Sequence, residues 1–211
     1  MKRLLIVNPN ASVAVTRWLA EEARRVAPTG VEILALNADS KLEALETPAD
    51  ILIAGCAVVR AIETHARAGD LVGAIIAAFG DPGLSEARAL GVTRMVGLGE
   101  ASIRAAARGG RRFSIVTLGA AMRESITTKV EALGFEPELS QVQVLPFSVS
   151  DMIADRDMAR ALIVDAVRHC PSEVVLLGGA PFAGMAQSIA QVTGKIVLCG
   201  VEACVRAILT D

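Results

Sequence analysis

The residues best placed to do chemistry follow an apolar run near the middle of the chain. Residues Ala74–Phe79 are apolar without interruption, which predicts a strand buried on both faces, and the chain must turn at Gly80-Asp81-Pro82-Gly83. A helical pattern follows this turn, and Asp81 or Ser85 is suited to cap that helix. Ligands of open parallel sheets gather at the carboxyl ends of the strands. We therefore expect residues 78–83 to form the floor of a small-molecule site.

Glycine is concentrated at the predicted ends of strands and at the helix starts that follow them. Half of the 18 glycines fall where a strand is predicted to end or the next helix to begin, namely Gly80, Gly83, Gly97, Gly99, Gly119, Gly178, Gly179, Gly184 and Gly200. Glycine at a strand end lets backbone N–H groups approach a ligand, and helix N-termini favour negative charge. A small carboxylate or a cyclic imide would suit such a site. Parallel folds also need glycine for tight turns, and the spacing does not decide between these two interpretations.

The cysteines and histidines do not form a pattern typical of metal binding. Cys56, Cys170, Cys199 and Cys204 include no Cys-x-x-Cys pair, and the two histidines lie far apart in the sequence. We therefore expect no metal site. The cysteines are expected to be buried or half-buried free thiols, and neither Cys199 nor Cys204 is expected to be a catalytic thiol.

The composition favours an α/β core and argues against nucleic-acid and membrane partners. Residues are 53% hydrophobic but only 3% aromatic, so Ala, Val, Leu and Ile build the core, as in buried parallel strands. The net charge is −2 and no helix carries a basic stripe, so we expect no nucleic-acid partner. The longest apolar runs are strand-sized, and the apolar part of the first residues is too short for a signal peptide. We expect a cytoplasmic protein without a membrane span.

Strands and helices are predicted to alternate along the whole chain, which is typical of parallel sheets. The pattern also repeats, because residues 96–104 are similar to residues 197–206, with Glu100 and Glu202 102 positions apart. Two copies of a half of roughly 100 residues explain this repeat, and two facing halves form a cleft between their strand ends. The predicted halves are residues 1–97 with 200–211, and residues 98–199.

Four turn motifs occur in a definite order. They are Asn8-Pro9-Asn10-Ala11-Ser12, Phe79-Gly80-Asp81-Pro82-Gly83-Leu84, Gly99-Glu100-Ala101-Ser102, and Leu177-Gly178-Gly179-Ala180 with Ala183-Gly184-Met185. Together they resemble the hydantoin racemase branch of the aspartate/glutamate racemase superfamily, and the similarity covers nearly the whole chain. The resemblance implies an α/β fold of two pseudo-symmetric, flavodoxin-like parallel-sheet halves with a cleft between them. It also implies a small carboxylate or cyclic imide as ligand, no cofactor, and a homo-oligomer.

In that family the reaction removes and returns a proton at a carbon next to a carbonyl. The resemblance implies two cysteines, one from each half, that act as base and acid on opposite faces of the substrate. Thiols suit this task because their pKa is close to neutral, and backbone N–H groups at the strand ends stabilise the enolate-like charge. This chain has Ala78 and Gly179 at the two positions, and Pro181 of the second turn lacks an N–H. Neither Ala78 nor Gly179 can carry a proton, so we do not expect two-base racemisation by the family route.

Other residues of these turns are then the candidates for the site. Asp81 or Glu100 is the candidate to move a proton, and Thr117 ends a predicted strand at the same face. Asp81 is also an ordinary turn and cap residue, and Glu100 is favourable in a first helical turn on dipole grounds alone. The expected substrate-binding positions are Asn8, Pro9, Asn10, Phe79, Gly80, Thr117, Gly119, Ala180 and Pro181.

Two functions remain open at this point. The first is a cofactor-independent, racemase-like isomerase of hydantoins or small amino-acid derivatives, in which Asp81, Glu100 or another group outside the family positions moves the proton. The second is a non-catalytic protein that holds a small acid in the same cleft, and Ala78 and Gly179 favour it. Deliberate replacement of the two cysteines is a third explanation, against which the altered turn around Gly179 argues.

Overall fold

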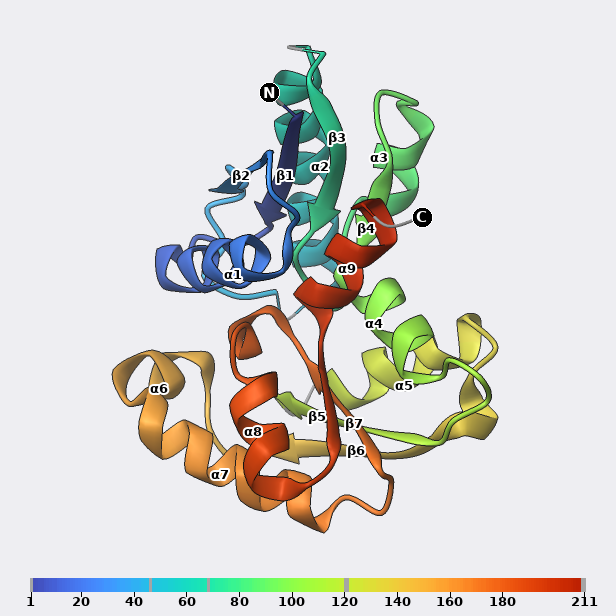
Figure 1. Ribbon diagram of the computed structural model, residues 1–211. Coiled ribbons are helices and arrows are strands. Elements are labelled where there is room, and N and C mark those ends of the chain that lie inside the picture. Colours follow the sequence, from blue (N-terminus) through green and yellow to red (C-terminus); the bar gives the residue numbers. More distant parts are fainter. Residues whose placement is uncertain (1, 46, 68, 120–121, 210–211) are drawn as a thin grey trace.

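Two four-stranded parallel sheets dominate the computed structural model, which describes residues 2–45, 47–67, 69–119 and 122–209 (Figure 1). The first sheet has the spatial order β2 (Val31–Asn37), β1 (Lys2–Asn8), β3 (Leu71–Ile76) and β4 (Met95–Gly97). The second has the order β6 (Leu139–Leu145), β5 (Phe113–Leu118), β7 (Val174–Gly178) and β8 (Ile196–Cys199). All strand pairs are parallel, and the second sheet repeats the topology of the first. The predicted α/β fold with two pseudo-symmetric halves is therefore confirmed.

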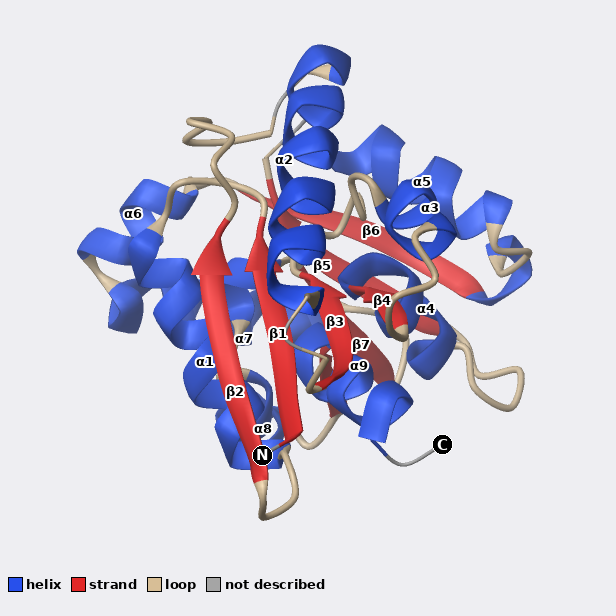
Figure 2. Cartoon of the chain, turned by 90° about the horizontal axis from the view of Figure 1, so that it is seen from above, coloured by secondary structure: helices blue, strands red, loops and turns tan. Residues whose placement is uncertain are grey.

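Helices cover both faces of the sheets (Figure 2). Side-chain caps begin several of them: Ser12 accepts a hydrogen bond from the N–H of Val15 at the start of α1, and Asp155 accepts one from Met158 at the start of α7. The helices are α1 (Val13–Val26), α2 (Pro48–Ala66), α3 (Leu84–Ala89), α4 (Leu98–Ala106), α5 (Met122–Ala132), α6 (Val149–Ala154), α7 (Arg156–His169), α8 (Ala186–Thr193) and α9 (Gly200–Leu209), with 3-10 turns at Glu136–Glu138 and Ala180–Phe182. Among the described residues, no helix is long and apolar enough to cross a membrane.

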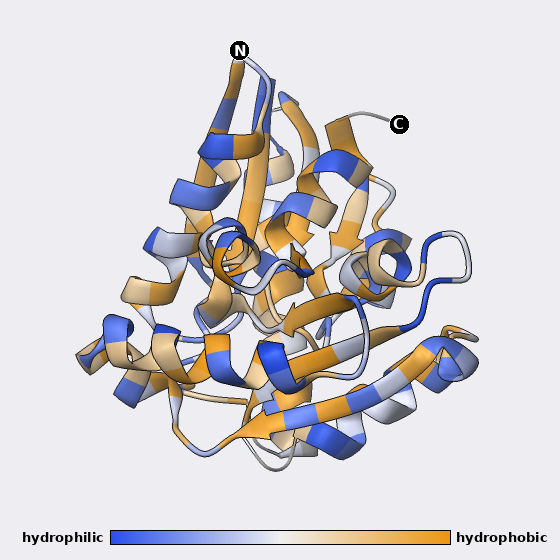
Figure 3. Cartoon of the chain, turned by 60° about the horizontal axis from the view of Figure 1, so that its bottom comes forward, coloured by the Kyte–Doolittle hydropathy of each residue, from blue (hydrophilic) through white to orange (hydrophobic). Residues whose placement is uncertain are grey.

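One hydrophobic core joins the two halves. Hydrophobic residues predominate in most strands, whereas hydrophobic and hydrophilic residues alternate along the helices (Figure 3). A single cluster of buried side chains includes Leu4 and Ile75 of the first sheet together with Ile115 and Leu176 of the second. The halves are therefore held in contact by apolar burial as well as by the chain that links them.

Helices α4 and α9 cross between the halves. Helix α4 follows β4 but packs against β7, and α9 follows β8 but packs against α1, β3 and β4 (Figure 1). A Cβ on Gly73 of β3 would lie 2.5 Å from the Cγ2 of Ile208, which shows how closely α9 approaches the first sheet. These contacts support the predicted division after residues 97 and 199, which stays a prediction. Residues 210–211 of the proposed first half lie outside the described residues.

Two element boundaries differ from the sequence-based expectation. The apolar run to Phe79 predicts a longer strand, but β3 ends at Ile76 and the chain turns at residues 78–80. Phe79 is apolar because it is buried at the contact between the halves, 4% exposed, and not because it belongs to a strand. The sequence pattern of residues 183–192 predicts a helix, but α8 begins only at Ala186, because Gly184 takes a left-handed φ of 81°.

Candidate functional site

The carboxyl ends of β3 and β7 face each other across the contact between the halves. Ala78 lies two residues beyond β3 and Gly179 directly follows β7, and both are half-buried. The ring of Phe79 lies beside the end of β7, since a Cβ on Gly178 would be 3.5 Å from its Cε2 atom. The structure thus brings the turns that carry Ala78 and Gly179 together, and neither position holds a group that can move a proton.

Asp81 closes the turn after β3 and caps a helix that starts 17 residues later in the chain. Its Oδ1 accepts a hydrogen bond from the N–H of Gly99 and its Oδ2 one from the N–H of Glu100, both at 2.8 Å. Gly97, at the N-cap position of α4, offers no side chain, so the carboxylate of Asp81 takes that role. The backbone of Asp81 is left-handed, with a φ of 52°, a conformation that Asp tolerates better than most residues.

Gly97 and Gly99 are required by this close approach. A Cβ on Gly97 would lie 2.4 Å from the Cγ of Asp81, and one on Gly99 would lie 1.9 Å from the carbonyl oxygen of Phe79. Any larger residue would push the turn off the start of α4. For these two glycines the structure supplies a packing reason, whether or not a ligand also lies nearby.

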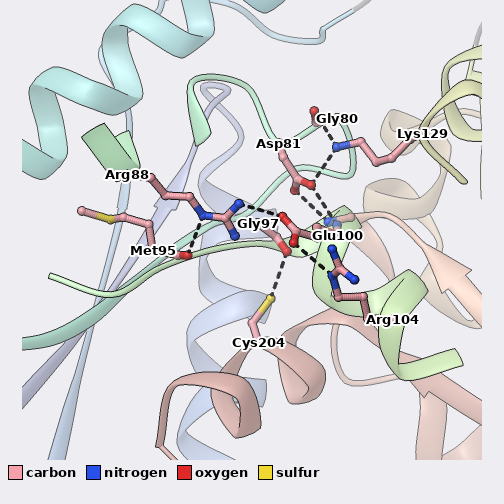
Figure 4. A network of polar contacts seen from close by, with 10 residues as sticks. Gly80, Asp81, Arg88, Met95, Gly97, Glu100, Arg104, Lys129 and Cys204 are labelled. Carbon is pink, nitrogen blue, oxygen red and sulfur yellow. Dashed lines mark hydrogen bonds and ion pairs between the residues drawn. The ribbon is translucent and has the colours of Figure 1, made fainter. Parts of the chain in front are cut away.

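Lys129 of α5 reaches the same turn from the second half. Its Nζ donates to the Oδ2 of Asp81 at 2.7 Å and to the carbonyl oxygen of Gly80 at 3.0 Å (Figure 4). Burial raises the pKa of the Asp81 carboxyl, while Lys129 and the N–H groups of Gly99 and Glu100 act in the opposite direction. Sequence reasoning missed Lys129, because nothing local to α5 distinguishes it from a solvated lysine.

Glu100 lies beside Asp81 but is engaged with two arginines. Its carboxylate forms ion pairs with Arg88 and Arg104, each at 3.0 Å (Figure 4). Burial on its own would raise the pKa of Glu100, but the guanidinium groups of Arg104 and Arg88 bring it below its ordinary value. Glu100 is therefore ionised and paired over the neutral pH range.

An open groove of about 530 Å³ runs between the halves at this point. Helix α3 and the start of α4 form one wall and α5 forms the other, so both carboxylates and Lys129 lie along it. The lining residues are Asp81, Leu84, Ser85, Arg88, Glu100, Ser125, Thr128, Lys129, Ala132 and Leu133. The groove is lined by hydroxyls, by charged groups of both signs and by the apolar side chains of Leu84, Ala132 and Leu133, which suits a small polar ligand.

The Asn8–Asn10 turn after β1 is held by hydrogen bonds to the beginning of α1 and to Ser40. The Nδ2 of Asn8 donates to the Oγ1 of Thr16 at 3.0 Å, and the Oδ1 of Asn10 accepts from the N–H of Ser12 at 3.0 Å. The carbonyl oxygen of Pro9 accepts a hydrogen bond from the Oγ of Ser40 at 2.7 Å.

The predicted positions of the second half are placed at the ends of β5 and β7. Thr117 is buried, and its hydroxyl donates to the carbonyl oxygen of Gly178 at 2.8 Å, so it ties the two strand ends together. Gly119 is exposed, Pro181 is half-buried and Ala180 is buried. These are placements of the expected substrate-binding residues, whose role stays a prediction.

The thiols of Cys199 and Cys204 are buried beneath the site rather than exposed in it. Burial raises the pKa of Cys199 to about 11 and raises that of Cys204 as well. Cys170 is buried too, whereas Cys56 is exposed on α2. Within the described ranges, no group of three or more His, Cys, Asp or Glu side chains is arranged to hold a metal ion.

The fold and the paired strand ends define the class of protein. The structure superposes on glutamate racemase from Thermus thermophilus with a TM-score of 0.62 at 19% identity, over 99% of this chain and 79% of that one, which shows a shared two-half architecture. The family model for Asp/Glu/Hydantoin racemase matches residues 4–208, and the chain therefore belongs to this family. The resemblance inferred from the four turn motifs is confirmed.

Relatives with racemase activity in their names cover almost the whole chain. A hydantoin racemase of Paenarthrobacter aurescens is 29% identical over 97% of this chain and 88% of its own length. A hydantoin racemase of Pseudomonas sp. (strain NS671) is 27% identical over 97% of this chain and 83% of its own length. The solved allantoin racemase from Klebsiella pneumoniae has a TM-score of 0.92 and 28% identity, covering 100% of this chain and 87% of that one. This family membership supports a racemase-like enzyme.

Proposed function

We propose that this chain is a cofactor-independent, racemase-like isomerase of a hydantoin-type cyclic imide or a related small amino-acid derivative. The observation that carries the proposal is the whole-chain similarity to hydantoin and allantoin racemases. The reaction class is proton removal and return at a carbon next to a carbonyl, and backbone N–H groups at the strand ends would stabilise the enolate-like charge. A cytoplasmic location and a homo-oligomeric state stay predictions of the same kind.

Because Ala78 and Gly179 carry no proton, another group must move it. Asp81 and Glu100 are the carboxylates that line the groove between the halves. Asp81 is the better base, since burial raises its pKa, whereas Arg88 and Arg104 keep Glu100 a weaker one. We therefore assign the proton transfer to Asp81. This role requires that one lone pair of the Asp81 carboxylate be directed at the ligand.

Exchange of the α-proton in deuterated water, followed by NMR, tests this assignment. Enantiopure hydantoins, allantoin and free amino acids are the probes. Asp81→Asn is expected to abolish exchange, while Glu100→Gln, its neighbour in the same groove, leaves the rate within a few-fold of the parent. Absence of exchange with every probe, or equal exchange in the parent and Asp81→Asn, would contradict the proposal.

A second candidate function is binding without turnover. The specific observation in its favour is that both cysteine positions are occupied by residues without a titratable group, Ala78 and Gly179. A thermal shift with a hydantoin or small carboxylate in the absence of α-proton exchange would support this function. No shift with any of these ligands would count against both candidates.

A further inference from the structure

We propose that Lys129 is a positioning residue that fastens the Gly80–Gly83 turn of the first half to helix α5 of the second half. Through Asp81 it also fixes the start of α4. We call this set of contacts the Lys129 bridge. Its effect on catalysis rests on the proposed function, but the bridge itself does not.

The bridge is a partly buried, charge-assisted contact. The side chain of Lys129 is 21% exposed and that of Asp81 only 2%, with 2.7 Å between Nζ and Oδ2. A second donation from the same Nζ goes to the Gly80 carbonyl at 3.0 Å. Removing one partner of such a pair leaves a buried charge without its counter-charge, which is strongly destabilising locally.

The two hydrogen bonds of Lys129 form the described polar link between α5 and the turn after β3. Helix α5 packs mainly on β5, β6 and the Glu136–Glu138 turn, all of which belong to the second half. The space between α5 and α3 is the open groove rather than an apolar interface. Across this groove, the side chain of Lys129 links α5 directly to the turn after β3.

A single carboxylate connects three segments. Asp81 accepts a hydrogen bond from Lys129 of α5 (Figure 4). It also accepts hydrogen bonds from the N–H groups of Gly99 and Glu100 of α4, while its own backbone forms the left-handed corner of the turn. If α5 moves away, the carboxylate loses its cation and its hold on α4 weakens. The Lys129 bridge thus links the spacing of the halves to the shape of the β3 end of the cleft.

Lys195 offers a matched control within the same chain. Its Nζ also makes two hydrogen bonds, in this case to the backbone carbonyls of Cys170 and Ser172, and both partners lie in the second half. Lys195→Met therefore removes a similar part-buried lysine without touching the contact between the halves.

Hydrogen–deuterium exchange of the ligand-free protein tests the bridge without any need for turnover. In Lys129→Met, amides in residues 78–84 and 98–101 are expected to exchange roughly tenfold faster or more, because a charge-assisted hydrogen bond is lost. Lys129→Arg is expected to restore most of the protection, and Lys195→Met is expected to leave both segments unchanged. Circular dichroism confirms that each variant is folded, and Lys129→Gln serves as a milder replacement if Lys129→Met is not.

The pH dependence separates the proposed bridge from simple packing by the lysine stem. Without the ammonium group, Asp81 takes up a proton at higher pH, so protection of the 98–101 segment in Lys129→Met is lost at a higher pH than in the parent. The same midpoint in Lys129→Met and Lys195→Met, or unchanged exchange in residues 78–84, would overturn the inference. Because no ligand is present, this outcome is independent of whether the proposed isomerase activity is found.

Discussion

Replacing Gly99 by alanine is expected to destabilise the protein, although alanine is the better helix former. Gly99 lies in the first turn of α4, where alanine alone would favour the helix by up to about 1 kcal/mol. A Cβ at this position would lie 1.9 Å from the carbonyl oxygen of Phe79. A comfortable C···O contact is about 3.3 Å or more, so the turn would have to move by more than 1 Å.

The size of the loss follows from this displacement. Overpacking costs about 1–3 kcal/mol, and disturbing the hydrogen bonds of Asp81 adds about 1.5–3 kcal/mol, from which the helix gain is subtracted. We expect a net loss of about 2–4 kcal/mol, which for a chain of this size lowers Tm by roughly 5–15 °C. Thermal unfolding followed by circular dichroism measures the shift.

Gly80→Ala is the control for this experiment. Its Cβ would meet only the Cδ1 of Ile51, at the ordinary distance of 3.7 Å, so the free energy of unfolding should change by less than about 1 kcal/mol. A Gly99→Ala variant as stable as the parent, or more stable, would show that the close approach of the turn to α4 is not what this position requires.

Two further predictions concern the cysteines. Cys56, on the exposed face of α2, should react with a thiol reagent in the native protein, while Cys170, Cys199 and Cys204 react only after unfolding. Mass spectrometry counts the modified thiols, and rapid modification of two or more in the native protein would contradict this prediction. Because burial raises the pKa of Cys199 from 9.0 to about 11, the unfolded chain ionises first and stability falls as the pH rises from about 9 to about 11. The fall in stability with pH should be shallower in Cys199→Ala than in the parent. Equal slopes of Tm against pH in the two proteins would contradict the prediction.

The order of strands and helices could be predicted from the sequence because buried parallel strands are read directly as apolar runs. Leu4–Val7 is such a run, and each of its residues is fully buried. The same signal fails beyond Ile76, where Phe79 is apolar because it is buried beside the end of β7 in the second half. Burial between the halves and burial within a sheet both select apolar residues, so the residue at which β3 ends could not be predicted from the sequence.

The turn after β3 could be located from the sequence, but not the contacts made by its residues, and of residues 78–83 only Asp81 lines the groove. Gly97 and Gly99 suggest a ligand that approaches the backbone. In the structure, however, Asp81 and Phe79 of the same chain already occupy the space that a Cβ atom at these two positions would need. A ligand and a neighbouring turn impose the same requirement, so the sequence cannot separate them. Lys129 escaped notice for a different reason, since its partner Asp81 lies 48 positions earlier and no periodic pattern links them.

The two roles assigned to Asp81 are compatible because a carboxylate has more acceptor sites than this one uses. Three donors occupy Asp81, and a carboxylate offers about four lone-pair sites, which leaves one for a substrate proton. Uptake of that proton would cancel the charge that holds Lys129, so proton transfer and the Lys129 bridge must be thermodynamically linked. The effects of Asp81→Asn and Lys129→Met on exchange of the 98–101 segment should then be strongly non-additive in a double-mutant cycle. Additive effects would mean that Lys129 acts on the turn through Gly80 alone, and that the charge of Asp81 plays no part in joining the halves.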